Sequence, residues 1–250
     1  MGKTSVWAHR GASAYAPENT LVAFQKAIDM KADGIELDVQ MTRDGQLIIL
    51  HDETLDRVSN ISGWVKDYTY EELKGINVNK EFPEYGLVNI PTLEELYLLI
   101  KDTKVLINVE LKNGIVFYPD LEEKVLELTN RMGLQDRIIY SSFNHYSILR
   151  LKKMDPSVKT GLLYADGYLD MSEYALKYGV EALHPALYNL QYPNFVKECK
   201  AKGIDLRVWT VNEIEDMKLL CKNEIDVIIT NYPDVGREVV DEYERKLRMD

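Results

Sequence analysis

The 250-residue chain has little of what several classes of protein require. Its two cysteines, Cys199 and Cys221, are too few for a disulfide scaffold and form no CxxC pair, so we expect both to be reduced. No run of 18 apolar residues occurs, and the N-terminal residues contain no apolar stretch of signal-peptide length. These absences argue against a disulfide-rich secreted domain and a transmembrane helix, and they predict a cytoplasmic protein.

An excess of positive charge is also missing. The 30 lysines and arginines face 41 aspartates and glutamates, a formal net charge of −11, so we expect no nucleic-acid partner. An anionic substrate would need cations gathered locally. The hydrophobic share of 46% and the charged share of 28% are globular values, and the length suits one large α/β barrel. We therefore predict a single domain over residues 1–250.

Short β-rich apolar runs alternate with helical patterns along most of the chain, which is typical of βα units around a parallel sheet. The strand candidates are residues 5–8, 34–40, 46–50, 104–110, 137–142, 158–163, 181–184, 205–210 and 225–229. The helix candidates are residues 19–32, 92–101, 119–132, 144–154, 170–178, 192–202, 213–223 and 234–247. Asn19 and Thr92 stand where helix N-caps are expected, and Gly133, Gly179 and Gly203 stand where helices should end.

The link between 34–40 and 46–50 breaks this alternation, because five residues cannot hold a crossover helix. Asp44-Gly45 is a hairpin turn signal, so 46–50 should run antiparallel to 34–40. The remaining strands and helices predict a (β/α)8 TIM barrel, an α/β fold, with residues 41–90 as a β-hairpin-containing insertion between strand 2 and helix 2. A doubly wound open sheet is the alternative architecture, but no GxGxxG turn follows the first strand.

Acidic side chains stand at the ends of two predicted barrel strands, where reactive groups of such barrels lie. Strand 2 carries Glu36 and Asp38, and strand 3 carries Glu110 and Lys112. Residues two apart share a face of a strand, so each pair points to one side. Charges in an apolar interior are costly unless they pair or coordinate, and carboxylate oxygens suit Mg²⁺ or Ca²⁺. The three carboxylates therefore predict a divalent metal site.

The predicted hairpin returns His51 to the same end of the barrel. A two-residue turn would place His51 opposite Asp38, and a three-residue turn would place it opposite Leu37. Strand 1 ends in His9 and Arg10, so two histidines converge beside the carboxylates and cations. An acid, a base, a metal site and anion-binding cations together are what phosphoryl transfer to or from an alcohol uses.

Several ordered motifs also carry a family resemblance: AHRGASAYAPENT, IELDVQMTRDG, LIILHDETLDR, IPTLEE, NVELK and VWTVN. Together, from residue 8 to about residue 231, they resemble the glycerophosphodiester phosphodiesterase family. The resemblance implies a (β/α)8 barrel and metal-dependent hydrolysis of a small-molecule glycerophosphodiester to glycerol 3-phosphate and an alcohol. It also motivates intramolecular attack by the neighbouring glycerol hydroxyl, through a cyclic phosphate.

Carried over by motif, the resemblance assigns roles to seven residues: acid and base to His9 and His51, metal ligation to Glu36, Asp38 and Glu110, and phosphate binding to Arg10 and Lys112. Phe143 and Trp209 follow or end predicted strands, where an aromatic can contact the glycerol carbons or the leaving alcohol, although core packing explains each nearly as well. Asn212 is a weaker candidate, and His184 is expected to cap its strand. The residues do not decide which histidine is the acid, which metal binds, or the oligomeric state.

Two other functions fit parts of the sequence. A lysophospholipase D-like lipid phosphodiesterase uses a similar barrel and site, but the insertion has no sustained amphipathic helix rich in Lys or Arg, so we expect no stable membrane association. The 16 tyrosines show no regular face that would mark a membrane belt.

A non-catalytic phosphodiester-binding barrel would lack a histidine or an acidic ligand, and all are present. Asp52, Glu53 and Asp56 are expected on the solvated surface.

Overall fold

Eight parallel strands form a closed ring in the computed structural model, which describes residues 4–249. The ring closes because β1 pairs with β9 on one side and with β2 on the other, and the predicted (β/α)8 barrel is thereby confirmed. The barrel strands are β1 Ser5–His9, β2 Gly34–Met41, β4 Leu106–Leu111, β5 Ile138–Ser142, β6 Lys159–Tyr164, β7 Ala182–Pro185, β8 Asp205–Val208 and β9 Val227–Thr230.

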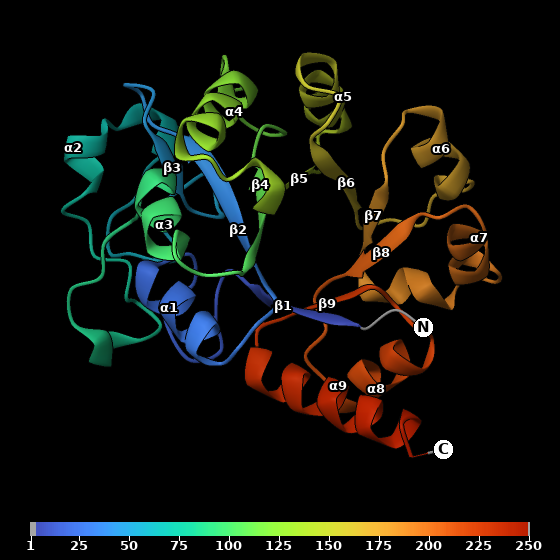
Figure 1. Ribbon diagram of the computed structural model, residues 1–250. Helices are drawn as coiled ribbons and strands as arrows, with labels where there is room; N and C mark the ends of the chain where they lie inside the picture. The colour runs from blue at the N-terminus through green and yellow to red at the C-terminus, as the bar shows by residue number, and fades with distance from the viewer. Residues whose placement is uncertain (1–3, 250) are drawn as a thin grey trace.

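A long helix follows each barrel strand, and Figure 1 shows these helices arranged around the ring. They are α1 Leu21–Asp29, α3 Leu93–Ile100, α4 Leu121–Met132, α5 His145–Met154, α6 Met171–Lys177, α7 Phe195–Ala201, α8 Ile214–Lys222 and α9 Pro233–Leu247. The sheet is buried on both faces, as a parallel sheet covered by helices requires, and all eight residues of β2 are buried.

The ends of the helices follow local chemistry, with one correction. Thr92 caps α3 as predicted, because its hydroxyl accepts from the Glu95 N–H while the Glu95 carboxylate accepts from the Thr92 N–H. Asn19 is not the cap of α1. Thr20 is, and Asn19 instead adopts a left-handed φ of 58° that turns its amide toward the barrel interior. Gly133 ends α4 at a φ of 66°.

The barrel interior contains a histidine, His184, whose position differs from the one predicted from the sequence. His184 is fully buried, with its Nε2 3.3 Å from the Arg207 guanidinium. Its ring lies edge-on to the Trp7 ring at a centroid distance of 6.5 Å. The prediction that His184 caps its strand is wrong, because its place on β7 directs the ring across the barrel toward β1 and β8.

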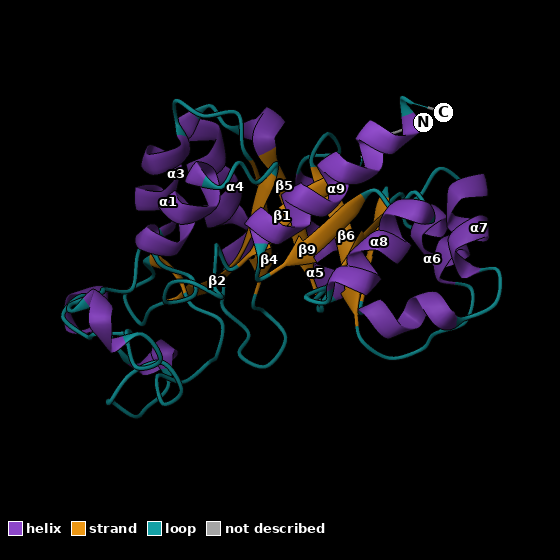
Figure 2. Ribbon diagram, turned by 90° about the horizontal axis from the view of Figure 1, so that it is seen from below, coloured by secondary structure: helices purple, strands orange, loops and turns teal. Residues whose placement is uncertain are grey.

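The segment between β2 and α3 carries the hairpin predicted from Asp44-Gly45. Strand β3 (Leu47–Ile49) pairs antiparallel with β2, and Gln40 lies opposite Ile48. This is the register that places His51 opposite Leu37. The segment continues through η1 Val65–Asp67, α2 Tyr70–Leu73 and η2 Pro83–Tyr85, and Figure 2 shows it extending from one side of the barrel. Its buried apolar residues form a small core of their own: Ile48, Leu50, Leu55, Val58, Val65, Leu73, Val78 and Ile90.

Candidate functional site

Three carboxylates from β2 and β4 meet inside the barrel, near the level where β1 ends at His9. Glu36, Asp38 and Glu110 are 5%, 0% and 7% exposed, and one oxygen from each lies within 4.8 Å of the others. The β2–β4 register places Asp38 directly opposite Glu110, which brings the two strands' acidic residues to the same level. The structure therefore gathers the acidic cluster that the strand ends predict.

Two cations and an amide hold these carboxylates. Lys112 Nζ lies 3.1 Å from Glu110 Oε1 and 3.7 Å from Asp38 Oδ1, and Arg10 Nε lies 3.5 Å from Asp38 Oδ2. The Asn19 amide donates to Asp38 Oδ2 at 2.8 Å. Arg10 adopts a left-handed φ of 56°, a conformation that costs free energy and that holds this residue in the turn after β1.

If all three carboxylates are ionised, the cluster carries more negative than positive charge, because only Lys112 and Arg10 pair with them. Burial, together with the neighbouring carboxylates, raises the pKa of Glu36 well above its usual range. Burial also raises the pKa of Glu110 to about 7, even though Lys112 opposes the shift. For Asp38, burial disfavours the charge, but Arg10 and Lys112 outweigh it and hold the pKa well below its usual range.

This arrangement fits a hard divalent cation. The donors are carboxylate oxygens, and a divalent cation would offset the surplus negative charge. Asp38 Oδ1 has no hydrogen-bond partner among the described residues. Asn108 is 1% exposed, lines the same pocket, and its side-chain oxygen and nitrogen also have no hydrogen-bond partner in the described part of the chain. Buried polar atoms without partners are rare unless a ligand, water or ion completes them.

His9 has a partner that the sequence does not reveal. Its Nδ1 lies 2.7 Å from Asn231 Oδ1, and the Asn231 N–H donates to Asn212 Oδ1 at 3.0 Å. Burial, with a contribution from Arg10, lowers the pKa of His9 to about 4. The neutral ring therefore donates from Nδ1 to the amide oxygen, and Nε2 is left with its lone pair. The only available sequence signal for Asn231 is its position directly after β9.

His51 is held by a different kind of partner. Its Nδ1 lies 2.5 Å from Asp52 Oδ1, a carboxylate rather than an amide. The buried Gln40 amide donates to the carbonyls of Leu50 and Asp52 at 2.8 and 2.7 Å, which fixes the backbone on both sides of the ring. Asp52 is predicted on the solvated surface and its side chain is 29% exposed, but its carboxylate is also paired with His51 and with Arg57.

The nine predicted site residues lie together at one end of the barrel. Seven of them line a pocket with Asn108, Leu163 and Ile229: His9, Arg10, Glu36, His51, Glu110, Phe143 and Trp209. Asp38 and Lys112 reach it through their ion pairs with Arg10 and Glu110. Phe143 and Trp209 pack edge-on, with ring centroids 5.5 Å apart, and form the apolar wall of the pocket.

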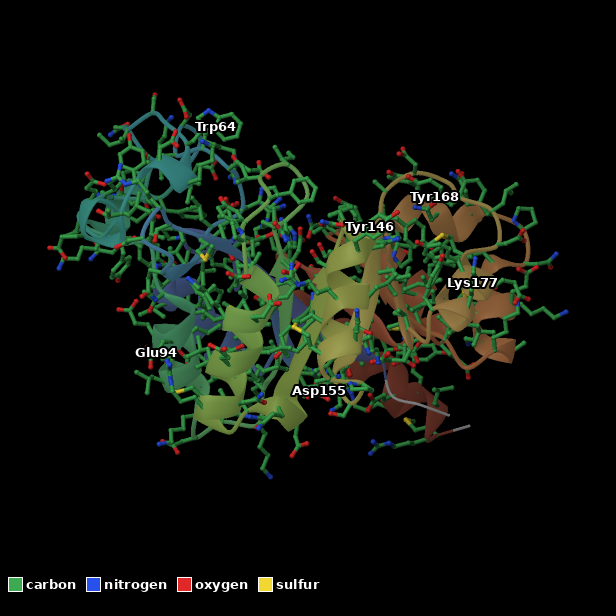
Figure 3. All side chains as sticks on the ribbon, turned by 90° about the horizontal axis from the view of Figure 1, so that it is seen from above. Trp64, Glu94, Tyr146, Asp155, Tyr168 and Lys177 are labelled. Atoms are coloured by element: carbon green, nitrogen blue, oxygen red, sulfur yellow. The ribbon has the colours of Figure 1, made fainter. Side chains whose placement is uncertain are left out.

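Exposed aromatic side chains surround this end of the molecule. In the described part of the chain, those with large exposure lie on segments that follow strands or in the first turn of the next helix: Trp64, Phe117, Phe143, Tyr146, Tyr168, Tyr188, Tyr192 and Tyr232. Figure 3 shows Trp64, Tyr146 and Tyr168 along one edge, with Asp155 at the opposite edge. Within residues 4–249, no helix has the length and apolarity to cross a bilayer.

Comparison with known proteins identifies the family of this chain. Residues 9–235 match the glycerophosphoryl diester phosphodiesterase family. A glycerophosphodiester phosphodiesterase of Caldanaerobacter subterraneus is 46% identical over 93% of this chain and 96% of its own. The structure of an Oleispira antarctica phosphodiesterase in complex with the product sn-glycerol-3-phosphate superimposes with a TM-score of 0.88, at 27% identity over 96% of this chain and 97% of that one. The chain belongs to the glycerophosphoryl diester phosphodiesterase family.

Proposed function

We propose that this chain hydrolyses glycerophosphodiesters to glycerol 3-phosphate and an alcohol, with Mg²⁺ or Ca²⁺ bound by Glu36, Asp38 and Glu110. The observation that carries the proposal is the pocket itself, where two histidines with different partners face a buried acidic cluster. The names of the relative from Caldanaerobacter subterraneus and of the product complex from Oleispira antarctica support this substrate class.

Positively charged groups bind the negatively charged phosphodiester. Glu36, Asp38 and Glu110 would hold a divalent cation, and the chemistry that it would supply there is that of a Lewis acid. Arg10 and Lys112 bind phosphoryl oxygens, and their guanidinium and ammonium groups offset the charge that develops there during the reaction. Phe143 and Trp209 provide apolar contact for the glycerol carbons or for the leaving alcohol.

The two histidines divide the proton transfers. His9, neutral and with a free Nε2, removes the proton from the glycerol hydroxyl next to the phosphate. That oxygen bonds to phosphorus while the bond from phosphorus to the leaving alcohol oxygen breaks, which gives a cyclic phosphate. His51, whose Nδ1 faces the Asp52 carboxylate, donates a proton to the leaving oxygen. Water then opens the cyclic phosphate as the two histidines exchange roles.

A ³¹P NMR time course with glycerophosphocholine and Mg²⁺ or Ca²⁺ tests this mechanism. We expect glycerol 3-phosphate to accumulate after a transient cyclic phosphate. The matched diester that lacks the neighbouring hydroxyl should remain intact, because it has no internal nucleophile. Equal turnover of both diesters would contradict intramolecular attack.

A second candidate function is supported by the exposed aromatic side chains around the pocket. A lysophospholipase D-like activity needs apolar surface near the site, and exposed aromatic side chains on segments that follow the barrel strands could contribute to it. The test compares turnover of glycerophosphocholine with that of a micellar lysophospholipid. Preference for the micellar substrate, lost in Phe117→Ser but kept in Met154→Ser at the end of α5, would favour this second activity over the first.

A further inference from the structure

A continuous chain of ion pairs joins two residues of the proposed site. His51 Nδ1 lies 2.5 Å from Asp52 Oδ1, and Asp52 Oδ2 accepts from Arg57 Nε at 2.7 Å. Arg57 Nη2 donates to Glu18 Oε1 at 2.6 Å, and that oxygen also accepts from Arg10 Nη1 at 3.1 Å. The chain therefore runs from the proposed proton donor to a proposed phosphate ligand.

Arg57 is the centre of this chain and uses two edges of its guanidinium. One edge binds both oxygens of Asp52, at 2.7 and 3.3 Å, and the other binds both oxygens of Glu18, at 3.1 and 2.6 Å. Such paired contacts fix direction as well as distance, and a lysine has no equivalent geometry. Although burial opposes ionisation, Arg57 lowers the pKa of both carboxyl groups, so the charges persist at neutral pH.

The series of ion pairs also connects separate parts of the sequence at the pocket. Asp52 and Arg57 belong to the segment between β2 and α3, whereas Glu18 belongs to the loop between β1 and α1. The Glu18 side chain is 17% exposed and that of Asp52 is 29% exposed. An ion pair that only stabilises the same segment looks different: Arg43 and Glu72 are 55% and 51% exposed and touch no predicted site residue.

We propose that Asp52, Arg57 and Glu18 are positioning residues, which hold the His51 ring and the Arg10 guanidinium in fixed orientation on two sides of the phosphodiester. This inference rests on the proposed function. Asp52 keeps the His51 Nδ1–H directed toward itself, so that Nε2 faces the pocket and carries the proton that is transferred. Glu18 aligns Arg10, and Arg57 couples the two carboxylates.

The leaving group provides a readout that a merely structural role would not move. A positioned acid matters most when the departing alkoxide is strongly basic, and it matters little for a nitrophenolate. Steady-state kinetics should therefore compare glycerophosphocholine with glycerophospho-4-nitrophenol. For Asp52→Asn we expect kcat to fall by about 10²-fold with the choline ester, the low end for a lost acid, and by only a few-fold with the nitrophenyl ester. KM should change little.

Further variants separate the contributions of the individual ion-paired residues. Arg57→Met should give the same leaving-group-selective loss in smaller measure, about 10-fold, because Asp52 stays in place but loses its support. The Asp52→Asn/Arg57→Met double variant should lose little more than Asp52→Asn alone, since both act through His51. Glu18→Gln should mainly raise KM. Arg43→Met, an arginine of the same segment outside the chain, is the control and should match the wild type.

Each outcome is decisive once circular dichroism shows folded protein. Equal losses on the two esters, or wild-type kcat in Asp52→Asn, would overturn the positioning role. If Asp52→Asn does not fold, the same comparison in Arg57→Met decides, because that substitution does not touch His51. A wild-type protein that releases no glycerol 3-phosphate from either ester would overturn the proposed function instead.

Discussion

Asp38 is the residue on which the charges of the site converge, since Arg10, Lys112 and Asn19 all contact its carboxylate. Asp38→Asn removes one charged ligand while keeping the shape of the side chain. We expect the dissociation constant for Mg²⁺ or Ca²⁺ to rise at least 10–100-fold, the scale seen for lesser changes around metal sites, with activity falling in parallel. Isothermal titration calorimetry measures the affinity, with Glu84→Gln, exposed in the β2–α3 segment, as control. An unchanged affinity would remove Asp38 from the metal site.

The partner of His9 predicts a change in pH dependence. His9 acts as a base only when neutral, so activity should fall as the pH drops through its pKa, which burial places at about 4. Asn231→Asp puts a carboxylate beside Nδ1, which favours the imidazolium and raises that pKa. The acidic limb of the kcat/KM profile should therefore move to higher pH. A limb that stays in place or moves lower would show that His9 is not this base.

The sequence predicts the residues that face the substrate better than those that hold them. Except for His51, the histidines, carboxylates and cations lie on barrel strands or directly after them, so barrel geometry directs them to one end, and the hairpin returns His51 there. Asn231 and Arg57 escape prediction because their roles are contacts between distant segments. His9 and Asn231, for example, are 222 residues apart. A carboxylate such as Asp52 next to a histidine is a weak sequence signal, since the same residue is equally common on a solvated loop.

At the scale of single elements, β6 provides a test of barrel packing. A Cβ added at Gly161 would lie 2.2 Å from His184 Nε2, so the ring and the strand would have to move apart. We expect Gly161→Ala to lower the free energy of unfolding by about 1–3 kcal/mol, the usual cost of overpacking. Gly75→Ala is the control, because nothing lies within 4 Å of its added Cβ. Equal stabilities in urea denaturation would contradict the packing described for His184.

Most helices and strands are predictable from the sequence, because hydrophobic periodicity and turn residues depend on local sequence. The eight barrel strands and the long helices lie within a few residues of their predicted bounds. Helix α2, only four residues long, gives too little periodicity to detect. The turn at Asp44-Gly45 predicts a hairpin but not its register, because two- and three-residue turns share that signal. Asn19 and Thr20 are both residue types that cap helices well. Thr20 caps α1, while the Asn19 amide donates a hydrogen bond to Asp38 instead.

At the scale of the whole molecule, stability should depend on pH through His184. Burial, together with Arg207, holds its pKa well below that of a free histidine, so the ring is neutral in the folded state. As the pH falls below about 6.5, the unfolded chain takes up the proton first, and folding loses about 1.4 kcal/mol per pH unit from this group. His184→Gln removes that contribution. Its unfolding free energy should fall less steeply than the wild type's between pH 6.5 and 5; parallel curves would contradict a buried neutral ring.

The protein has a formal net charge of −11, but two cations, Arg10 and Lys112, lie together at the site. We expect the acidic exterior to repel nucleic acid, and we expect Arg10 and Lys112, together with a divalent cation at the acidic cluster, to attract the proposed phosphodiester. A cytoplasmic location and the absence of a nucleic-acid partner stay predictions.

We propose that this chain hydrolyses a glycerophosphodiester in a reaction that depends on a divalent cation. The most direct measurement is ³¹P NMR of glycerophosphocholine with the wild-type protein, first with Mg²⁺ or Ca²⁺, then with excess chelator, and then with the cation restored. We expect glycerol 3-phosphate in the first sample, none with chelator, and recovery in the third. Full activity in chelator, or no glycerol 3-phosphate with either cation, would contradict it.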